Sequence, residues 1–144
     1  MELYKSPLRR VVFASGLLCA CGCFGPDSGP ERFEVSGTVT LDGAPAPRGE
    51  VFFAPDTKKG NTGPGAVTNV VDGRYRTTEG KGVTPGPHLV NIVAFDGIPA
   101  GDMPDGRPLT TKTYQVEVDL PAENSVQDFD VPPSHLVNRV RARP

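Results

Sequence analysis

Three cysteines at alternate positions are the residues whose spacing first suggests chemistry. Cys19, Cys21 and Cys23 lie in the stretch LLCACGCFG, and the chain of 144 residues has no other cysteine. Such thiols could ligate a metal, form a redox pair or accept a lipid. Three thiols without a fourth ligand nearby make a poor zinc site, and a disulfide framework needs cysteines spread through the fold. The arrangement therefore favours attachment of a membrane anchor to one sulfur atom.

The residues before the cysteines have the layout of a secretory signal. Residues 1–10 (MELYKSPLRR) are polar and net positive, and residues 11–20 (VVFASGLLCA) are apolar and uncharged. The apolar run is too short to span a bilayer as a helix. The segment Leu18-Cys19-Ala20-Cys21 resembles the bacterial lipobox, in which the final cysteine becomes the first residue of the mature chain and carries a diacylglyceryl group. The resemblance implies lipidation of Cys21, with Cys23 as the runner-up.

The N-terminal segments are accordingly assigned to export and anchoring. Residues 1–20 are predicted to be a lipoprotein signal peptide, and residues 21–32, rich in Gly and Pro, a flexible tether. Burial of acyl chains contributes roughly 0.8 kcal/mol per methylene, and more than one chain gives durable anchoring. The predicted location is a bacterial membrane, on its periplasmic or cell-surface side. A plain secreted chain with incidental cysteines is the alternative.

Composition limits the fold and the partners. The chain has 17 Gly and 16 Pro with 37% hydrophobic residues, which indicates many turns and short elements. The formal net charge is −2, and the first 20 residues are net positive, so the remainder is more acidic still. A mildly acidic body gives no electrostatic reason to bind nucleic acid. The one downstream basic cluster, in the stretch NRVRARP, could meet anionic lipid headgroups, or it could be a solvated terminus.

Alternation of apolar and polar residues predicts an all-β fold. Seven segments show this period of two or a short apolar run, and Asp-Gly pairs or Gly-Pro clusters separate them. The last segment is expected to pair back onto the one before it. The pattern is typical of an antiparallel sandwich of Ig-like or transthyretin-like type, spanning 33–131 and followed by a tail at 132–144. The predicted strands are 33–42, 50–54, 66–71, 74–78, 88–95, 114–120 and 126–131.

The same alternation predicts which side chains form the core. On each segment one set of apolar residues shares a face. About 100 residues in such a fold can bury roughly two-thirds of their extended-chain surface. The predicted core consists of Val35, Val39, Leu41, Val51, Phe53, Tyr75, Val90, Ile92, Val116, Val118 and Phe129.

Several of these segments together resemble a known family. VSGTVTLDGAPAPRGEVFFAP at 35–55, DGRY at 72–75 and TPGPHLVNI at 84–92 resemble the carboxypeptidase regulatory-like domain. The sequence departs from the usual pattern at His88, where that pattern has Tyr, and in the long segment 96–113. Such domains are accessory β-sandwiches without catalytic residues, and small bacterial lipoproteins that contain one are a known type. The resemblance implies an interaction or structural role.

The remaining polar residues offer weak alternatives to that role. His88 is expected to be a partly buried strand residue, and His135 lies in the tail after two prolines. Asp96, Asp102 and Asp105 could hold Ca²⁺ in a flexible loop, although Asp-Gly pairs are first of all turn formers. The chain contains no G-x-S-x-G elbow. We therefore assign no catalytic, metal-binding or cofactor-binding residue and expect a protein that is not an enzyme.

Two hypotheses for function remain from the sequence. The first is a lipid-anchored envelope protein that binds another envelope protein or has a structural role, with the loops 55–65, 79–86 and 96–113 as its contact surface. The second is a carbohydrate-binding module at the cell surface. That alternative needs exposed aromatic platforms, and because the chain has no Trp, only Tyr114 and Phe95 are suitable.

Overall fold

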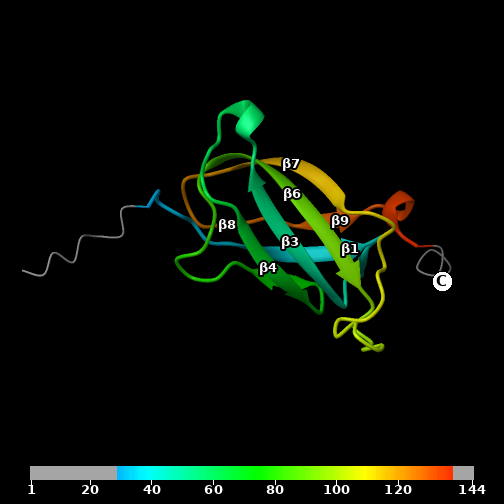
Figure 1. The fold of residues 1–144 in the computed structure, drawn as a ribbon. Coiled ribbons are helices and arrows are strands. Elements are labelled where there is room, and N and C mark those ends of the chain that lie inside the picture. Colours follow the sequence, from blue (N-terminus) through cyan, green and yellow to red (C-terminus); the bar gives the residue numbers. More distant parts are fainter. Residues whose placement is uncertain (1–28, 138–144) are drawn as a thin grey trace, which may run out of the picture.

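The computed structural model describes residues 29–137, and the predicted signal peptide, Cys21 and Cys23 lie outside the described residues. The described part is all-β, as the sequence predicted, with nine strands and two short 3₁₀ turns (Figure 1). None of its helical turns is long and apolar enough to cross a membrane. The strands are β1 (Val35–Leu41), β2 (Ala44–Pro45), β3 (Arg48–Pro55), β4 (Ala66–Val71), β5 (Arg74–Arg76), β6 (Gly86–Phe95), β7 (Tyr114–Leu120), β8 (Ser125–Val126) and β9 (Phe129–Val131), and the turns are η1 (Thr57–Lys59) and η2 (Pro133–His135).

The main sheet is antiparallel and curls into a half-barrel. Its strand order is β2-β1-β5-β4-β3-β6-β7. The two short strands β8 and β9 run parallel to β1. Ser36 pairs with both Arg76 of β5 and Val126 of β8, so β8 lies on the edge of β1 opposite to β5. The expectation that 126–131 pairs back onto the preceding strand was wrong, because this segment pairs with the first strand instead.

Two Asp-Gly pairs form the turns that the sequence predicted for them. Asp42 and Gly43 have φ angles of 52° and 79°, and Asp72 and Gly73 have φ angles of 49° and 76°. Positive φ at both central residues is the requirement of the tight hairpin turns that match strand twist. The first turn joins β1 to β2, and the second joins β4 to β5.

The core lies on the concave side of the curled sheet. Three aromatic rings from different strands meet there, Phe53, Tyr75 and Phe129, with centroids 6.1–6.4 Å apart. The hydroxyl of Tyr75 donates a hydrogen bond of 2.7 Å to the carbonyl of Gln127. Burial raises the pKa of the Tyr75 phenol above its ordinary range. This bond ties β5 to the segment between β8 and β9.

Most of the predicted core is confirmed. Nine of the eleven predicted residues are buried, and the exceptions are Val116 and Val118, which are half-buried. Both lie on β7, which has β6 as its one hydrogen-bonded neighbour in the described chain and is therefore an edge strand. Two further core residues, Leu109 and Leu136, come from segments without alternation. Leu136 belongs to the segment predicted as a tail, and it forms an isolated β-bridge with Thr110. The described chain therefore stays packed on the sheet as far as Val137.

The C-terminal strands are fixed to β1 by polar side chains and by a close approach of backbones. Thr38 donates two hydrogen bonds of 2.8 Å to the Asp128 carboxylate, from its backbone N–H and from its hydroxyl. Thr40 donates a hydrogen bond of 2.6 Å to Asp130. At Gly37 a Cβ atom would overlap the carbonyl of Gln127. The glycine therefore lets the segment between β8 and β9 cross β1 closely.

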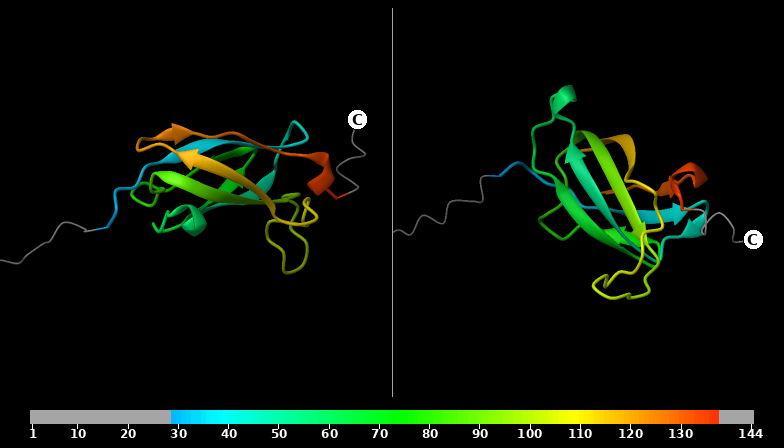
Figure 2. Two further views of the ribbon diagram at one scale, coloured as in Figure 1. Left: turned by 90° about the horizontal axis from the view of Figure 1, so that it is seen from above. Right: turned by 45° about the vertical axis from the view of Figure 1, so that its right-hand side comes forward.

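The half-barrel has two ends, and the chain enters at one of them. The blue segment that leads into β1 lies at the left of Figure 1, as does the loop that follows β5, and the loop that follows β3 lies above them. The loop from 96 to 113 and the turn η2 (red) lie at the other end (Figure 2). The two Asp-Gly turns belong to that second end, since β1 and β4 both run toward it.

Candidate functional site

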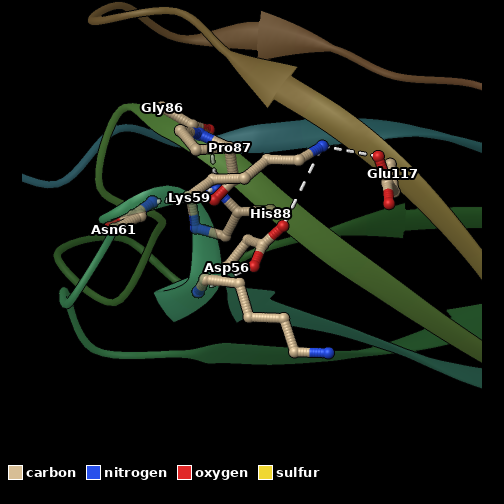
Figure 3. Close-up of polar contacts among 8 residues, drawn as sticks. Asp56, Lys59, Asn61, Gly86, Pro87, His88 and Glu117 are labelled. Carbon is tan, nitrogen blue, oxygen red and sulfur yellow. Dashed lines mark hydrogen bonds and ion pairs between the residues drawn. The ribbon is translucent and has the colours of Figure 1, made fainter.

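The three loops predicted as a contact surface divide between the two ends of the half-barrel. Loops 55–65 and 79–86 lie together at the end where the chain enters, and loop 96–113 lies at the opposite end (Figures 1 and 2). They therefore form two separate surfaces. The first is held by a polar network that Figure 3 shows in close-up, and the second is closed at its base by one aspartate.

Asn61 is the centre of the network at the entry end. Its side-chain amide donates a hydrogen bond of 3.0 Å to the carbonyl of Pro87. Its side-chain oxygen accepts hydrogen bonds from the backbone of Gly63 at 3.2 Å and from the hydroxyl of Thr84 at 3.4 Å. Its own backbone N–H donates to the carbonyl of Asp56. A single side chain thus holds the loop after β3 against the segment that leads into β6.

A chain of charges continues from this network onto the outer surface. Asp56 is buried, and its carboxylate caps η1 by accepting from the backbone of Lys58 at 3.0 Å. The Lys59 ammonium lies 3.9 Å from Asp56 and 2.5 Å from Glu117 of β7 (Figure 3). The hydrogen bond to Glu117 is the main cause that raises the pKa of Lys59. Because Lys59 and Glu117 are both exposed, water screens the pair and it adds little to stability.

His88 lies beneath this network and cannot meet a molecule at the surface. Its side chain is buried, with 1% of the residue exposed, as part of the inward face of β6. Nδ1 lies 2.9 Å from the carbonyl oxygen of Gly86 and 3.4 Å from the side-chain nitrogen of Asn61. Nε2 is buried without a hydrogen-bond partner among the described residues. The sequence predicted a partly buried strand residue, and the structure buries it completely.

The long loop is organised by its first aspartate. The Asp96 carboxylate accepts hydrogen bonds from the backbone N–H groups of Ile98 at 3.1 Å and Arg107 at 2.9 Å. The backbone N–H of Asp96 donates to the carbonyl of Arg107, so the two ends of the loop are joined. Within residues 29–137 there is no cluster of three or more His, Cys, Asp or Glu side chains suited to a metal ion. The Asp96 carboxylate thus stabilises the turn at the start of the loop, as aspartates before glycine commonly do.

The aromatic residues weighed for a glycan platform do not share a face. Phe95 ends β6 on the outer face of the sheet, and Tyr114 begins β7 on the inner face, opposite Ile92. Both are half-buried, and the Tyr114 ring meets the His135 ring edge-on at 5.1 Å. His135 is therefore half-buried against β7. The two rings cannot stack together on one sugar chain.

The structure exposes apolar side chains that the sequence analysis did not single out. Phe52 and Val67 are directly paired across β3 and β4, with 44% and 61% of each residue exposed. Val71 is exposed on the same face of β4. We call these three residues the β3–β4 patch. In the long loop, Ile98 and Met103 are also exposed. The signal was available for Phe52, because Val51 and Phe53 were assigned to the opposite face.

Comparisons with known proteins do not identify this chain. No protein family model, no curated protein and no solved structure matches it. The geometry described above is therefore the basis for the functional argument, together with the sequence.

Proposed function

We propose that this chain is a non-catalytic, lipid-anchored interaction module of a bacterial envelope, of the carboxypeptidase regulatory-like type. The lipobox-like segment ending at Cys21 supports the anchor, and the all-β fold agrees with the resemblance. In this proposal the body is exported and stays attached to the membrane through the tether that ends near residue 32.

The observation that carries the proposal is that the chain enters the half-barrel at the end opposite to loop 96–113. The chain enters the half-barrel at one end, and loop 96–113 projects from the other. β1 runs from the first end to the second over seven residues, which corresponds to about 23 Å at strand rise. An anchor at Cys21 would keep the entry end near the membrane and present the long loop to partners in the surrounding compartment.

Exposed apolar side chains at two places support binding of a protein. Ile98 is 67% exposed in the long loop, and the exposed residues Asp102 and Asp105 belong to the same loop. Phe52 and Val67 of the β3–β4 patch form a second apolar area on the sheet. Apolar groups bordered by charges are typical of protein contact surfaces. The glycan-binding alternative is weaker, since Tyr114 and Phe95 lie on opposite faces of the sheet.

The anchor is tested by the mass of the chain in the membrane fraction. The expected species begins at Cys21 and carries acyl mass. Replacing Cys21 with Ser should remove the acyl mass, and the matched Cys23→Ser variant should keep it. A soluble chain that retains residues 1–20 would overturn the anchor.

The interaction role is tested separately, with a photo-crosslinking residue at Ile98 in the anchored protein. We expect a discrete crosslinked protein that is absent when the crosslinker stands at Glu79, at the entry end. On a glycan array, the protein itself should bind no sugar appreciably. Binding to glycans without a protein crosslink at Ile98 would favour the carbohydrate-binding alternative.

A further inference from the structure

The outer edge of β7 is open for another strand. β7 pairs with β6 from Gly86↔Leu120 to Ile92↔Tyr114, and no other strand of the described residues pairs with it. An edge strand presents unpaired backbone donors and acceptors, and these can bind an extended peptide as an additional strand. β7 is seven residues long, which is enough for such pairing.

The side chains of β7 define which strand would fit. Tyr114, Val116 and Val118 face inward and pack on the core, yet they stay half-buried at the edge. Glu117, which also pairs with Lys59, and Asp119 face outward and are exposed. Cross-strand neighbours on one face interact, and opposite charges there stabilise a pair of strands. The edge therefore suits a strand with apolar residues facing inward that alternate with basic residues facing outward.

The end of this chain has that pattern. In NRVRARP, at 138–144, Arg139, Arg141 and Arg143 alternate with Val140 and Ala142. Placed beside β7, the two apolar residues would cover Val116 and Val118. Arg141 would then face Glu117, and the two flanking arginines would face Asp119 and Gln115. By contrast, β7 of a second copy would set carboxylates against carboxylates, which is unfavourable.

The direction of the chain at Val137 decides which molecule donates the segment. Leu136 bridges Thr110 in antiparallel orientation, and the Val137 N–H donates to the carbonyl of Leu109. The chain therefore leaves toward Leu109, away from β7, which begins later at Tyr114. The seven residues after Val137 would have to reverse direction before they could pair with β7 of the same molecule.

We infer that residues 138–143 of one copy bind as an added strand on the β7 edge of a second copy. The contact joins two different surfaces, so it links molecules head to tail. It does not require the lipid anchor, although two copies on one membrane would meet at a higher effective concentration. The bound strand and the edge that binds it thus come from two copies of the same chain.

The inference is tested with a chain that ends at Val137 and a synthetic peptide of residues 138–144. Hydrogen exchange of the 114–120 amides is measured as the peptide is added. We expect slower exchange in β7 alone, and no effect from a peptide of the same composition in which the arginines are adjacent. Equal protection by both peptides would mean that the contact is unspecific charge attraction, and this would overturn the inference. The absence of any protection in β7 would overturn it as well.

A charge exchange tests the register in the full chain. Glu117→Lys and Arg141→Glu should each weaken self-association about tenfold, as measured by sedimentation in detergent, because Arg141 lies opposite Glu117 when Val140 and Ala142 cover Val116 and Val118, and each change turns that opposite-charge pair into a like-charge pair. The double variant should regain most of the loss. Glu50→Lys makes the same charge change on β3, away from the edge, and should leave association unchanged. A double variant no better than either single variant would contradict the pairing.

Discussion

At Gly37 the absence of a side chain lets two strands of the protein meet. A Cβ at this position would overlap the carbonyl of Gln127, and because the two nearest atoms are backbone they cannot rotate away. Gly37→Ala should therefore lower the free energy of unfolding by about 2 kcal/mol or more, within the range for overpacking. Chemical denaturation measures the change. Gly29→Ala is the matched control, since nothing lies near its added Cβ, and a similar loss in both variants would contradict the argument.

Asp128 gives the protein a defined sensitivity to acid. The hydroxyl and the backbone N–H of Thr38 donate to its carboxylate and lower its pKa below the usual 3.8. A carboxyl whose pKa is lower in the folded state stabilises the fold above its unfolded pKa, and this contribution is lost as the pH falls through the folded value. We expect Asp128→Asn to be less stable than the parent near pH 6.

The difference between Asp128→Asn and the parent should shrink below about pH 4, near the ordinary carboxyl pKa. Thermal unfolding at several pH values measures it. Glu123→Gln serves as the control, because Glu123 is exposed in the turn before β8. A difference that stays constant from pH 6 to pH 3 would show that the carboxylate charge is not what matters.

Among the elements, the loops at the entry end depend on Asn61. Asn61→Ala removes the bonds to Pro87, Thr84 and Gly63 and leaves the carbonyl of Pro87 with one donor fewer. We expect faster hydrogen exchange in 56–65 and 84–88 and a loss of about 1–2 kcal/mol in stability. Lys58→Ala, at an exposed position of η1, should change neither. Uniform acceleration across all strands would instead indicate a global effect.

The elements also show what the sequence could predict. Alternation identified the longer strands, because the period of two is a local property. For β6 both faces carry apolar residues, which predicted burial on both sides, and the structure buries the face of His88 and Val90 and half-buries the other. It did not predict that β8 and β9 pair in parallel with β1, since alternation defines a face and not a partner. Leu109 and Leu136 were missed for a related reason: single apolar residues in loops have no period. Of the polar network, His88 and the loop 55–65 were noted, but Asn61 was not, because its role depends on carbonyls brought near by the fold.

For the whole molecule, the proposed anchor makes one end of the half-barrel the membrane-proximal end. A tether of about 12 residues has an r.m.s. length of roughly 20 Å, comparable to the length of β1, so the body can tumble but not invert freely. A fluorophore at Lys81, at the entry end, should be quenched more by nitroxide lipids than one at Asp102, in the long loop. Both positions are exposed, so labelling should not disturb the core. Equal quenching would mean that the tether does not orient the body.

The position of β1 also determines when the protein can fold. Its outer edge is completed by β8 and β9, and the bond from Thr38 to Asp128 closes a loop of 90 residues. Closing contacts between distant parts of a chain slows folding. While the polypeptide is being made, β1 gains its partners on this edge only after residues 125–131 have left the ribosome. In the proposed route of export, this late completion of the sheet favours passage of the chain through a narrow translocation channel before it folds.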